Sequence, residues 1–493
     1  METEANRVIE PAETNQFDLD IKTSVRGGWF GWLGPLGATA LAALIRLPNL
    51  GRPHELVFDE TYYAKDALSL LNFGVERKFV EGANEKLLGT DGTNYLSIFT
   101  ADPAYVVHPP IGKWVIASGE ALFGATPFGW RIAVALLGIL SVLLTARIAR
   151  RLTNSNFIGT VAGSLLALDG LHITMSRTAL LDTTLSFFVL CAFGALIIDR
   201  DRLSNSVFRI WRWVMVIALG LAISTKWSAL YYAVTFGGLM LFWDFARRKR
   251  DGDLGRWTSK DLLPAFAMPF IAIGIYLASW VGWFRSENGW GRTWGLTNNN
   301  SFLPDALASL INYHRDMWHF HTTLVTPHGY QANPWGWPLM LRPTSFFYES
   351  ENTCAAARCS QEVIPLGNPL IWWVGVLALI LLLALAVNKR FSAALPIVAA
   401  FLAGWLPWLF FTKRTVFNFY SVVYLPYTVM ALAILLYLIN KKIKSTKPIS
   451  KRWPAIVFLI CVAALTAFFY PILVGQSIPY DMWHMRMWLP TWI

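Results

Sequence analysis

The sequence predicts an all-α polytopic membrane protein. Of its 493 residues, 55% are hydrophobic and only 15% are charged, and the mean hydropathy is +0.42. A soluble protein carries about 25% charged residues, because its surface must face water. When the chain is threaded through a membrane, its short Lys- and Arg-rich connections all fall on one side, as cytoplasmic loops do. These observations exclude a soluble multidomain protein.

The predicted spans run from near the N-terminus almost to the C-terminus. About eleven segments approach the 20 or so apolar residues that cross a bilayer. They lie near residues 30–50, 128–147, 157–172, 178–198, 211–225, 228–245, 263–283, 368–387, 391–411, 416–439 and 453–474.

This arrangement divides the chain into three parts. Residues 1–28 form a cytoplasmic N-terminal tail before an uncleaved first span, residues 29–474 form the membrane domain, and residues 475–493 form an extracytoplasmic C-terminal tail. Two long connections, residues 51–127 and 284–367, fall on the outer side, and connections of that length are usually functional. The second contains Cys354 and Cys359, for which a disulfide is plausible in an oxidising exterior.

The net charge of +11 follows from 42 Lys and Arg against 31 Asp and Glu. On a soluble protein this excess would favour nucleic-acid binding. In a membrane protein it sets topology. We therefore expect membrane lipids and no nucleic acid among the partners.

The first outer loop begins with paired carboxylates, Asp59 and Glu60. A helix starting at Asp59 would place Asp59, Tyr63 and Asp66 on one face and turn Glu60 about 100° away. Paired carboxylates at a membrane surface suit proton transfer. A capping aspartate followed by a solvated glutamate would give the same pattern, so spacing alone leaves both interpretations open.

The same loop ends in His108-Pro109-Pro110-Ile111-Gly112-Lys113. The prolines favour entry into a helix that lies in the outer interface. Lys113 there can extend to lipid head groups. His108 is more often a structural hydrogen-bonding group than a base.

Four basic residues sit at outer ends of spans, where topology gives no reason for them: Arg131, Arg177, Lys226 and Arg414. Each alone could reach lipid head groups, but together they predict a shared anion, such as a lipid phosphate. Asp182, near the outer end of its span, is expected to hold a cation from another helix.

Histidines gather in the second outer loop, at His314, His319, His321 and His328. His319 and His321 on a strand could both face a metal, but the loop has no zinc-type Cys/His spacing, so we expect no metal site. The aromatic and histidine content equally suits a carbohydrate or peptide groove, or an interfacial aromatic belt.

These segments together resemble the protein O-mannosyltransferases, in a bacterial, actinobacterial form. The resemblance covers about residues 30–440. It rests on residues 58–60 (Phe-Asp-Glu), 108–113 (His-Pro-Pro-Ile-Gly-Lys), 176–182 (Ser-Arg through Leu-Asp), 224–227 (Ser-Thr-Lys-Trp), 335–338 (Trp-Gly-Trp-Pro) and, more loosely, 414–420. The chain lacks room for the luminal β-trefoil domain of the eukaryotic members.

The resemblance implies a C-class glycosyltransferase fold in the plasma membrane. It implies transfer of mannose from polyprenyl-phosphate-mannose to Ser or Thr hydroxyls of translocated proteins on the outer face, with the translocon a candidate location. It implies no required cofactor and leaves divalent-metal dependence open. The resemblance also suggests Asp59 as the general base and Glu60 as a second catalytic residue that positions the acceptor or the sugar.

The remaining site residues are assigned to substrate binding. Lys226, Arg131 and Arg414, in that order, are expected to bind the donor phosphate, since cations can stabilise that leaving group without a strong acid. One base and no nucleophile predict inversion, which converts a β-linked donor into an α-mannoside. The other predicted substrate contacts are Tyr63, His108, Lys113, Arg177, Asp182 and Trp227.

Two alternatives remain at the level of sequence. A related transferase could move a lipid-phosphate sugar to a glycolipid or cell-wall acceptor. A lipid transporter or flippase would explain the outer cations, but not the Asp-Glu pair or the long outer loops.

Overall fold

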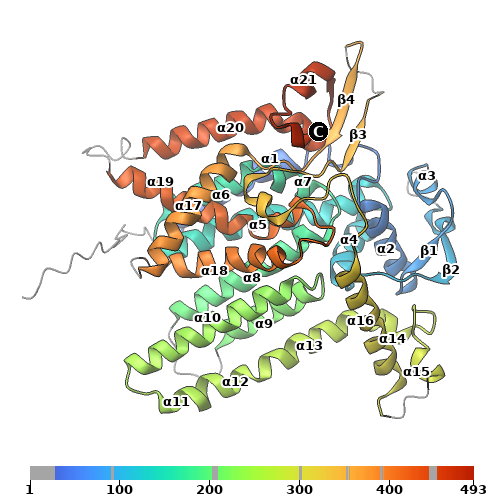
Figure 1. Cartoon of the computed structure of the whole chain (residues 1–493), viewed down its shortest axis with the longest axis horizontal. Coiled ribbons are helices and arrows are strands. Elements are labelled where there is room, and N and C mark those ends of the chain that lie inside the picture. The colour runs from blue at the N-terminus through green and yellow to red at the C-terminus, as the bar shows by residue number, and fades with distance from the viewer. Residues whose placement is uncertain are drawn as a thin grey trace, which may run out of the picture.

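Long helices run side by side along the longest dimension of the molecule, and shorter elements gather at one end (Figure 1). The computed structural model describes residues 28–89, 94–202, 209–298, 302–350, 354, 356–388, 391, 393–442 and 452–493. The predicted tail at residues 1–28 therefore lies, except for Gly28, outside the described residues.

Among these residues, six helical segments are long and apolar enough to cross a membrane. They are α5 (Pro127–Thr153), α8 (Leu181–Asp201), α10 (Ala229–Arg250), the run Gly255–Ser279 that ends in α13 (Ala267–Ser279), α17 (Pro369–Val387) and α20 (Trp453–Val474). The bent pair α6 (Asn156–Leu168) and α7 (Gly170–Arg177) makes a seventh if counted as one span. The polytopic all-helical prediction is confirmed.

Four shorter apolar helices coincide with the remaining predicted spans. They are α1 (Phe30–Arg46), α9 (Ile210–Ile223), α18 (Ala394–Trp405), which continues into η4 (Leu406–Phe410), and α19 (Leu425–Lys442). Length and composition do not establish these four as spans, so the predicted total of eleven is not confirmed.

Several helices begin where the sequence supplies a cap. The Thr126 hydroxyl accepts a hydrogen bond from the Gly129 amide, with Pro127 in the first turn of α5. The Asn368 side chain plays the same part for α17, which also has a proline in its first turn. These caps satisfy amides that a helix start leaves unpaired.

The predicted span at 157–172 is interrupted at Asp169, where α6 and α7 meet at 61°. The Asp169 carboxylate accepts hydrogen bonds from the amide of His172, from the amide of Asn368 and from the indole of Trp372, the last two at the start of α17. The side chain of Arg46 bonds the carbonyls of Leu166 and Ala167 at the end of α6. The polar groups freed by the break are therefore bonded within the protein, as a membrane interior requires.

The first outer loop folds as a small unit. It contains α2 (Glu60–Phe73), β1 (Arg77–Phe79), α3 (Ala83–Leu88), η1 (Tyr95–Ile98), β2 (Phe99–Pro103) and α4 (Ile111–Phe123). Strands β1 and β2 pair antiparallel, and α2 packs on α4 around a separate apolar core. The helices predicted after Asp59 and after the His-Pro-Pro segment are both present.

The second outer loop joins the C-terminal residues in one sheet. The loop contains α14 (Val281–Arg285), α15 (Trp294–Thr297), α16 (Asp305–Thr323), η3 (Pro334–Leu339), β3 (Phe347–Glu349) and β4 (Cys359–Val363). The antiparallel order β3-β4-β5 brings in β5 (Ser477–Pro479), which precedes α21 (Tyr480–His484) and η6 (Pro490–Trp492). Cys354 and Cys359 form a disulfide at the start of β4. Residues 475–493 are therefore folded onto the outer loop.

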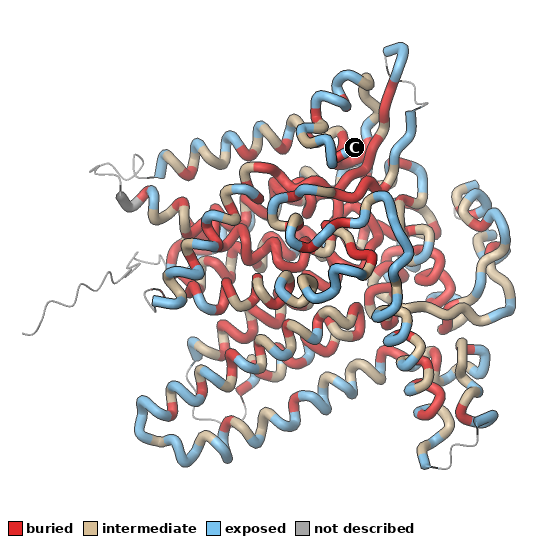
Figure 2. The backbone as a smooth tube through the Cα atoms, viewed as in Figure 1, coloured by how far each residue is buried: buried red, intermediate tan, exposed pale blue. Residues whose placement is uncertain are grey.

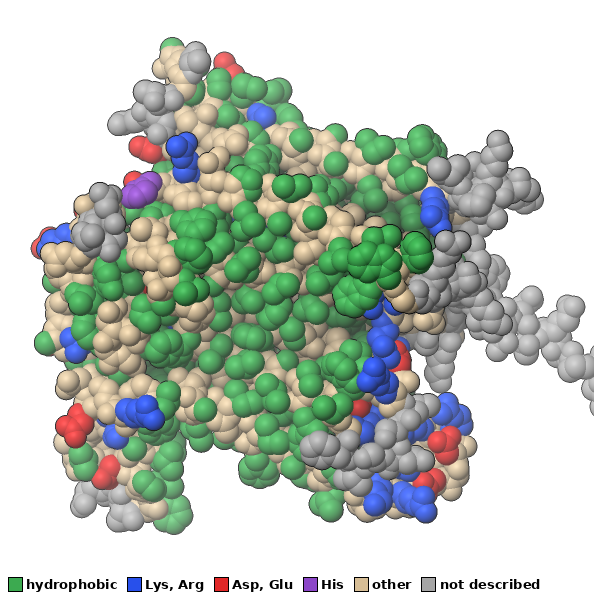
Figure 3. All heavy atoms as spheres, turned by 180° about the vertical axis from the view of Figure 1, so that it is seen from behind, with side chains coloured by type: hydrophobic (Ala, Val, Ile, Leu, Met, Phe, Trp, Pro, Cys, Tyr) green, Lys and Arg blue, Asp and Glu red, His purple; other side chains and the backbone are tan. Residues whose placement is uncertain are grey.

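Charge and burial divide the molecule along its length. The backbone is most deeply buried where α5, α6, α8 and α19 meet (Figure 2). Apolar side chains cover the middle of the face in Figure 3, while Lys and Arg gather at the end that holds the corner after α10. The outer loops occupy the opposite end (Figure 1).

Candidate active site

An aromatic cluster fixes the backbone just before the paired carboxylates. Phe58 has φ of +52°, which is a costly conformation for a bulky residue. Its ring stacks on Phe346 at a centroid distance of 4.8 Å and meets Phe417 and Phe419 edge-on at 5.7 and 5.6 Å. These rings come from the second outer loop and from the segment before α19, so distant parts of the chain orient Asp59.

The two neighbouring carboxylates have different surroundings. Glu60 is fully buried, and its oxygens accept four hydrogen bonds, from the amides of Val57 and Ala179 and from Nε and Nη2 of Arg131. The Asp59 side chain makes no capping hydrogen bond at the start of α2. Glu60 is therefore held by the protein itself, while Asp59 is available to other groups.

Arg131 and Arg177 hold the loop that leads into α2. Nη1 and Nη2 of Arg131 bond the carbonyls of Leu50, Pro53 and Glu55. The Arg177 guanidinium bonds the carbonyls of Arg46, Pro48 and Asn49.

Both guanidiniums are at least 95% buried. The donors of Arg131 are already used, so its predicted phosphate-binding role is not supported by this geometry. Arg177 directs both of its terminal nitrogens to carbonyls of the loop, so the geometry gives no support to its predicted share in an anion site.

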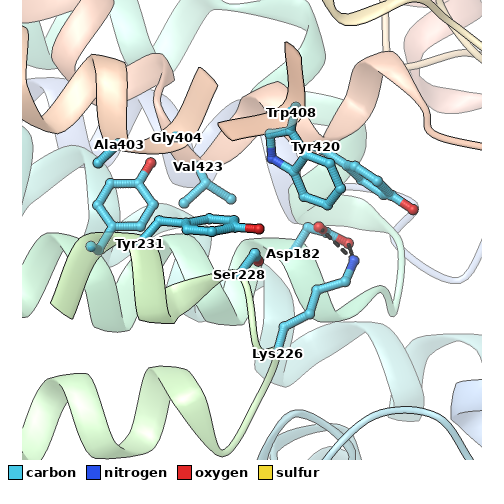
Figure 4. A pocket seen from close by; sticks show the side chains of 10 residues that line it. Asp182, Lys226, Ser228, Tyr231, Ala403, Gly404, Trp408, Tyr420 and Val423 are labelled. Atoms are coloured by element: carbon cyan, nitrogen blue, oxygen red, sulfur yellow. Dashed lines mark hydrogen bonds and ion pairs between the residues drawn. The ribbon is translucent and has the colours of Figure 1, made fainter. Parts of the chain in front are cut away.

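Asp182 and Lys226 form an ion pair beside the site (Figure 4). Nζ of Lys226 lies 2.9 and 3.0 Å from the two Asp182 oxygens and 4.4 Å above the centre of the Tyr420 ring. Lys226 comes from the connection between α9 and α10, and Asp182 from the first turn of α8. Asp182 therefore holds a cation from a distant part of the chain as predicted, although Lys226 lies in the connection between two helices and not on a helix.

A cavity of about 370 Å³ has Lys226 of this ion pair in its wall. The described residues that line it are His108, Lys226, Trp227, Ser228, Leu230, Tyr231, Trp318, His321, Thr322, Trp408, Phe411, Arg414 and Tyr420. It therefore brings together four of the predicted site residues, His108, Lys226, Trp227 and Arg414, from separate parts of the sequence.

His321 holds Arg414 at the cavity through two hydrogen bonds, one to the backbone and one to the arginine. His321 Nε2 donates to the Val107 carbonyl at 2.7 Å, which leaves Nδ1 to accept from Nη2 of Arg414 at 3.3 Å. Nε of Arg414 is buried and has no partner among the described residues. A buried unpaired donor on a cation is suited to an anionic ligand.

The histidines of the cavity are neutral. Burial lowers the pKa of His321 to about 4. Burial, with Lys226 and His321 nearby, places the pKa of His108 well below its usual value. Burial disfavours the Lys226 ammonium, but Asp182, Tyr420 and Asp59 outweigh that effect and raise its pKa. Lys226 and Arg414 are therefore the cations of the cavity.

Asp59 lies within electrostatic reach of the same ion pair. Burial raises the pKa of Asp59 to about 6, with Lys226 lowering it and Asp182 raising it. Tyr63, one turn along α2, is partly buried near Asp59, and burial raises its pKa well above the usual value. At neutral pH, Asp59 is a carboxylate with more proton affinity than an exposed aspartate has.

Lys113 and Trp227 are positioned by buried partners. Lys113 forms a buried ion pair with Glu76, and this geometry supports neither the predicted substrate contact nor the alternative of reaching lipid head groups. The indole of Trp227 donates to the Tyr276 hydroxyl, which lies 2.7 Å from His314 Nε2.

The His-rich segment is helical where a strand was considered. His314, His319 and His321 lie on α16, where residues two positions apart do not share a face. Among the described residues, no group of three His, Cys, Asp or Glu side chains could hold a metal ion. His321 instead faces the cavity.

Sequence reasoning missed part of the cavity wall. Tyr231, Trp408, Trp318 and Tyr420 line it but were not predicted as site residues. Tyr420 could have been found, because it ends the segment that begins with Arg414. The others carry no motif and are brought in by helix packing alone.

Comparison with known proteins places these features in a family. Residues 306–492 match the model of the C-terminal four-TMM region of protein O-mannosyltransferase, and residues 103–279 match the model of dolichyl-phosphate-mannose-protein mannosyltransferase. The chain is 34% identical to the polyprenol-phosphate-mannose–protein mannosyltransferase of Mycobacterium tuberculosis, over 92% of this chain and 90% of that protein. Its identity to the protein of the same name from Corynebacterium glutamicum is 31%, over 88% of each.

The fold also matches a solved structure. A chain of the Saccharomyces cerevisiae protein O-mannosyltransferase Pmt1-Pmt2 complex bound to the sugar donor superposes with a TM-score of 0.75. The match covers 94% of this chain and 93% of that chain at 15% identity. At that identity the likeness shows the fold.

Proposed function

The chain belongs to the family of polyprenol-phosphate-mannose–protein mannosyltransferases, and we propose that it transfers mannose by a single inverting displacement with Asp59 as general base. The enzyme is a multi-pass membrane glycosyltransferase whose donor is polyprenyl-phosphate-mannose and whose acceptors are proteins. The finer proposals concern the base, the phosphate site, the lipid groove and the face of the membrane.

The different surroundings of Asp59 and Glu60 are the observation that supports Asp59 as the general base. An acceptor hydroxyl needs a base as it attacks the sugar, and a base with a pKa near working pH is the most effective. Burial raises the pKa of Asp59 to about 6, whereas four protein hydrogen bonds occupy Glu60. Asp59 therefore accepts the proton, and Glu60 positions Asp59 by tying the start of α2 to Arg131.

Lys226 and Arg414 stabilise the departing lipid phosphate. Bond cleavage leaves negative charge on the phosphate oxygen, and fixed cations in a water-poor cavity stabilise that charge. Asp182 holds Lys226 over Tyr420, and His321 holds Arg414. Both cations are thus in position before the donor binds.

An apolar groove of about 570 Å³ continues from this cavity between α9, α10 and α13. Trp227 and Leu230 line both spaces. Towards the other end of the bundle, the groove wall contains Gly237, Met240 and Met268. A polyprenyl chain is long and apolar, so the groove suits the tail while the cavity holds the phosphate.

The positions of charge and site support transfer on the outer face. The basic end of α10 lies opposite the end that holds α2 and α16 (Figure 1), and basic connections favour the cytoplasmic side. The active site and C-terminus are then extracytoplasmic. The acceptor hydroxyls then belong to proteins that have crossed the membrane. We assign no cofactor to the reaction.

The test is mannosyl transfer in membranes that contain the enzyme. Membranes with wild type or Asp59→Asn are given polyprenyl-phosphate-mannose with a radiolabelled sugar and a Ser/Thr-rich peptide. Asp59→Asn should lower the rate by about 100-fold or more, because a general base contributes about that factor.

Asp102→Asn is the matched control, since this aspartate lies in the same loop but is exposed. Transfer by Asp59→Asn at the wild-type rate would remove Asp59 from the mechanism, while absence of any labelled peptide with wild type would contradict protein mannosylation itself. An α-linkage in the product, read by α-mannosidase release, tests inversion.

A further inference from the structure

A second polar cavity lies at the end of the bundle opposite Asp59. It has a volume of about 310 Å³ and opens between the ends of α8, α9 and α10. The described residues lining it are Asp199, Arg200, Arg209, Met240, Trp243, Asp244, Ala246, Arg247 and Arg250. Figure 3 shows Lys and Arg gathered at this end, at the right and lower right of the view, with a few Asp and Glu among them.

The two carboxylates of the cavity are already balanced. Arg209 bonds Asp199 through Nε at 2.8 Å and Asp244 through Nη1 at 2.8 Å. Arg212 bonds the same two carboxylates through Nε and Nη2. These four side chains are all at least 93% buried and form a neutral square of two cations and two anions.

The remaining arginines of the lining are only partly balanced. Arg247 lies 3.5 Å from Asp244 and 3.3 Å from Asp261. Asp244 is also bonded by Arg209 and Arg212, and Asp261 is also bonded by Arg248. Arg250 contacts only its exposed neighbour Asp251 at 3.3 Å, and such surface pairs are weak. Arg200 pairs with Asp201 at 2.8 Å, and Arg248 also pairs with Asp253. Among the described residues that line the cavity, four are arginines and two are aspartates, so its wall carries more positive than negative charge.

We propose that this cavity binds a phosphate group, carried by the headgroup of an anionic membrane lipid or by a soluble phosphate compound. Arginine matches phosphate because its planar guanidinium donates two parallel hydrogen bonds. The cavity adjoins apolar helix surface and is lined by Trp243, over which Arg200 lies at 5.3 Å. Tryptophan and arginine together are typical of the membrane interface, where lipid phosphates lie.

The test compares lipids and variants on the full-length protein in detergent. A ligand that binds only the folded protein raises its unfolding temperature. Cardiolipin should raise that temperature, and phosphatidylcholine at the same mole fraction should not. For the double variant Arg247→Gln/Arg250→Gln, the half-saturating cardiolipin fraction should rise about tenfold, as loss of charge-assisted hydrogen bonds predicts.

Two controls keep the result interpretable. Arg256→Gln/Lys260→Gln removes the same charge at the same end from exposed residues outside the cavity, and its cardiolipin response should equal that of wild type. Arg250→Gln alone changes an exposed side chain and serves if the double variant unfolds. An equal response in the cavity and control variants would overturn the proposal.

Inorganic phosphate distinguishes the two sources of the ligand. If phosphate, matched to chloride for ionic strength, stabilises wild type but not the Arg250→Gln variant, the cavity recognises the phosphate group alone. If only cardiolipin does so, the lipid headgroup is the ligand. If neither does, the proposal is wrong.

Discussion

At the scale of single residues, Asp59 and Glu60 show how two adjacent carboxylates can take unlike roles. The difference comes from the neighbours that the fold supplies, since both residues belong to the same turn. Arg131 and two amides use the lone pairs of Glu60, while burial leaves Asp59 with a raised pKa of about 6.

The pH dependence of transfer should report this pKa. A general base works as the carboxylate, so protonation as the pH falls through about 6 should reduce the rate by tenfold per pH unit, with a plateau above it. The measurement is kcat/KM for the acceptor peptide between about pH 4.5 and 8. This range spans the pH values at which a carboxyl group with a raised pKa titrates. A rate that does not vary with pH across 6 would contradict this role.

Asp182→Asn should move that acid limb to lower pH. Asp182 raises the pKa of Asp59 and Lys226 lowers it, so removal of the Asp182 charge lets the Lys226 effect dominate. The same pH series on the variant measures the shift. Asp481→Asn, on α21, is a control that leaves this ion pair intact.

Arg131→Gln should destabilise the protein while leaving donor binding largely unchanged. It leaves the Glu60 charge buried without its cation, which costs about 3–5 kcal/mol. Thermal unfolding in detergent measures the loss, and Arg256→Gln, at an exposed position, should change stability by no more than about 0.5 kcal/mol. A stable Arg131→Gln enzyme with a raised KM for the donor would instead restore the phosphate-binding role.

The sequence alone found the residue types of the site but not their partners. Asp182, Lys226 and Arg414 were recognisable because charge at the outer end of a span is unusual. A cation at the outer end of a span could be a ligand contact or a structural group. The sequence could not distinguish Lys226, which faces the cavity, from Arg131, whose donors bond Glu60 and carbonyls of the preceding loop. That distinction depends on contacts about 70 or 80 residues apart.

At the scale of elements, the groove between α9, α10 and α13 makes a prediction about lipid length. Gly237 lines the groove, and a Cβ at that position would meet no atom within 4 Å. Gly237→Leu should therefore fold normally and occupy space that a polyprenyl tail needs.

We expect the KM for a long-chain donor to rise several-fold in Gly237→Leu, with little change for a short-chain analogue. Gly238→Leu is a matched control, because Gly238 has equal room for a Cβ and does not line the groove. Equal KM values for the two variants with the long-chain donor would contradict a lipid groove here.

The lengths of the apolar segments predicted most of the long helices, but not the break between α6 and α7. Residues 156–177 contain enough apolar residues for a span, yet Asp169 ends α6 and caps α7. Its partners Asn368 and Trp372 are about 200 residues away, so local periodicity could not reveal the bend. The short strand pairing of β4 with β5 is hidden for the same reason.

At the scale of the whole molecule, the two ends differ in charge and in content. The outer loops, the cavity and Asp59 gather at one end, and the arginine-rich cavity lies at the other (Figure 1). The order of charged loops along the sequence predicted this polarity, because it depends only on alternation of spans.

Membrane orientation can be read by labelling introduced cysteines in intact cells. Asp102 and Arg250 have side chains 68% and 71% exposed, and Cys191 and Cys461 would first be replaced by Ser. A membrane-impermeant maleimide should label Asp102→Cys in intact cells and Arg250→Cys only after permeabilisation. The reverse pattern would place the active site in the cytoplasm.

The outer arginines also bear on how the chain is assembled. Arg131 bonds carbonyls of residues 50–55, and Arg177 bonds carbonyls of residues 46–49. A chain is synthesised from its N-terminus, so each arginine meets acceptors that the ribosome has already made. Neither guanidinium has to wait for later helices to find these hydrogen-bond acceptors, so the loop before Asp59 can be bonded to both arginines early in biogenesis.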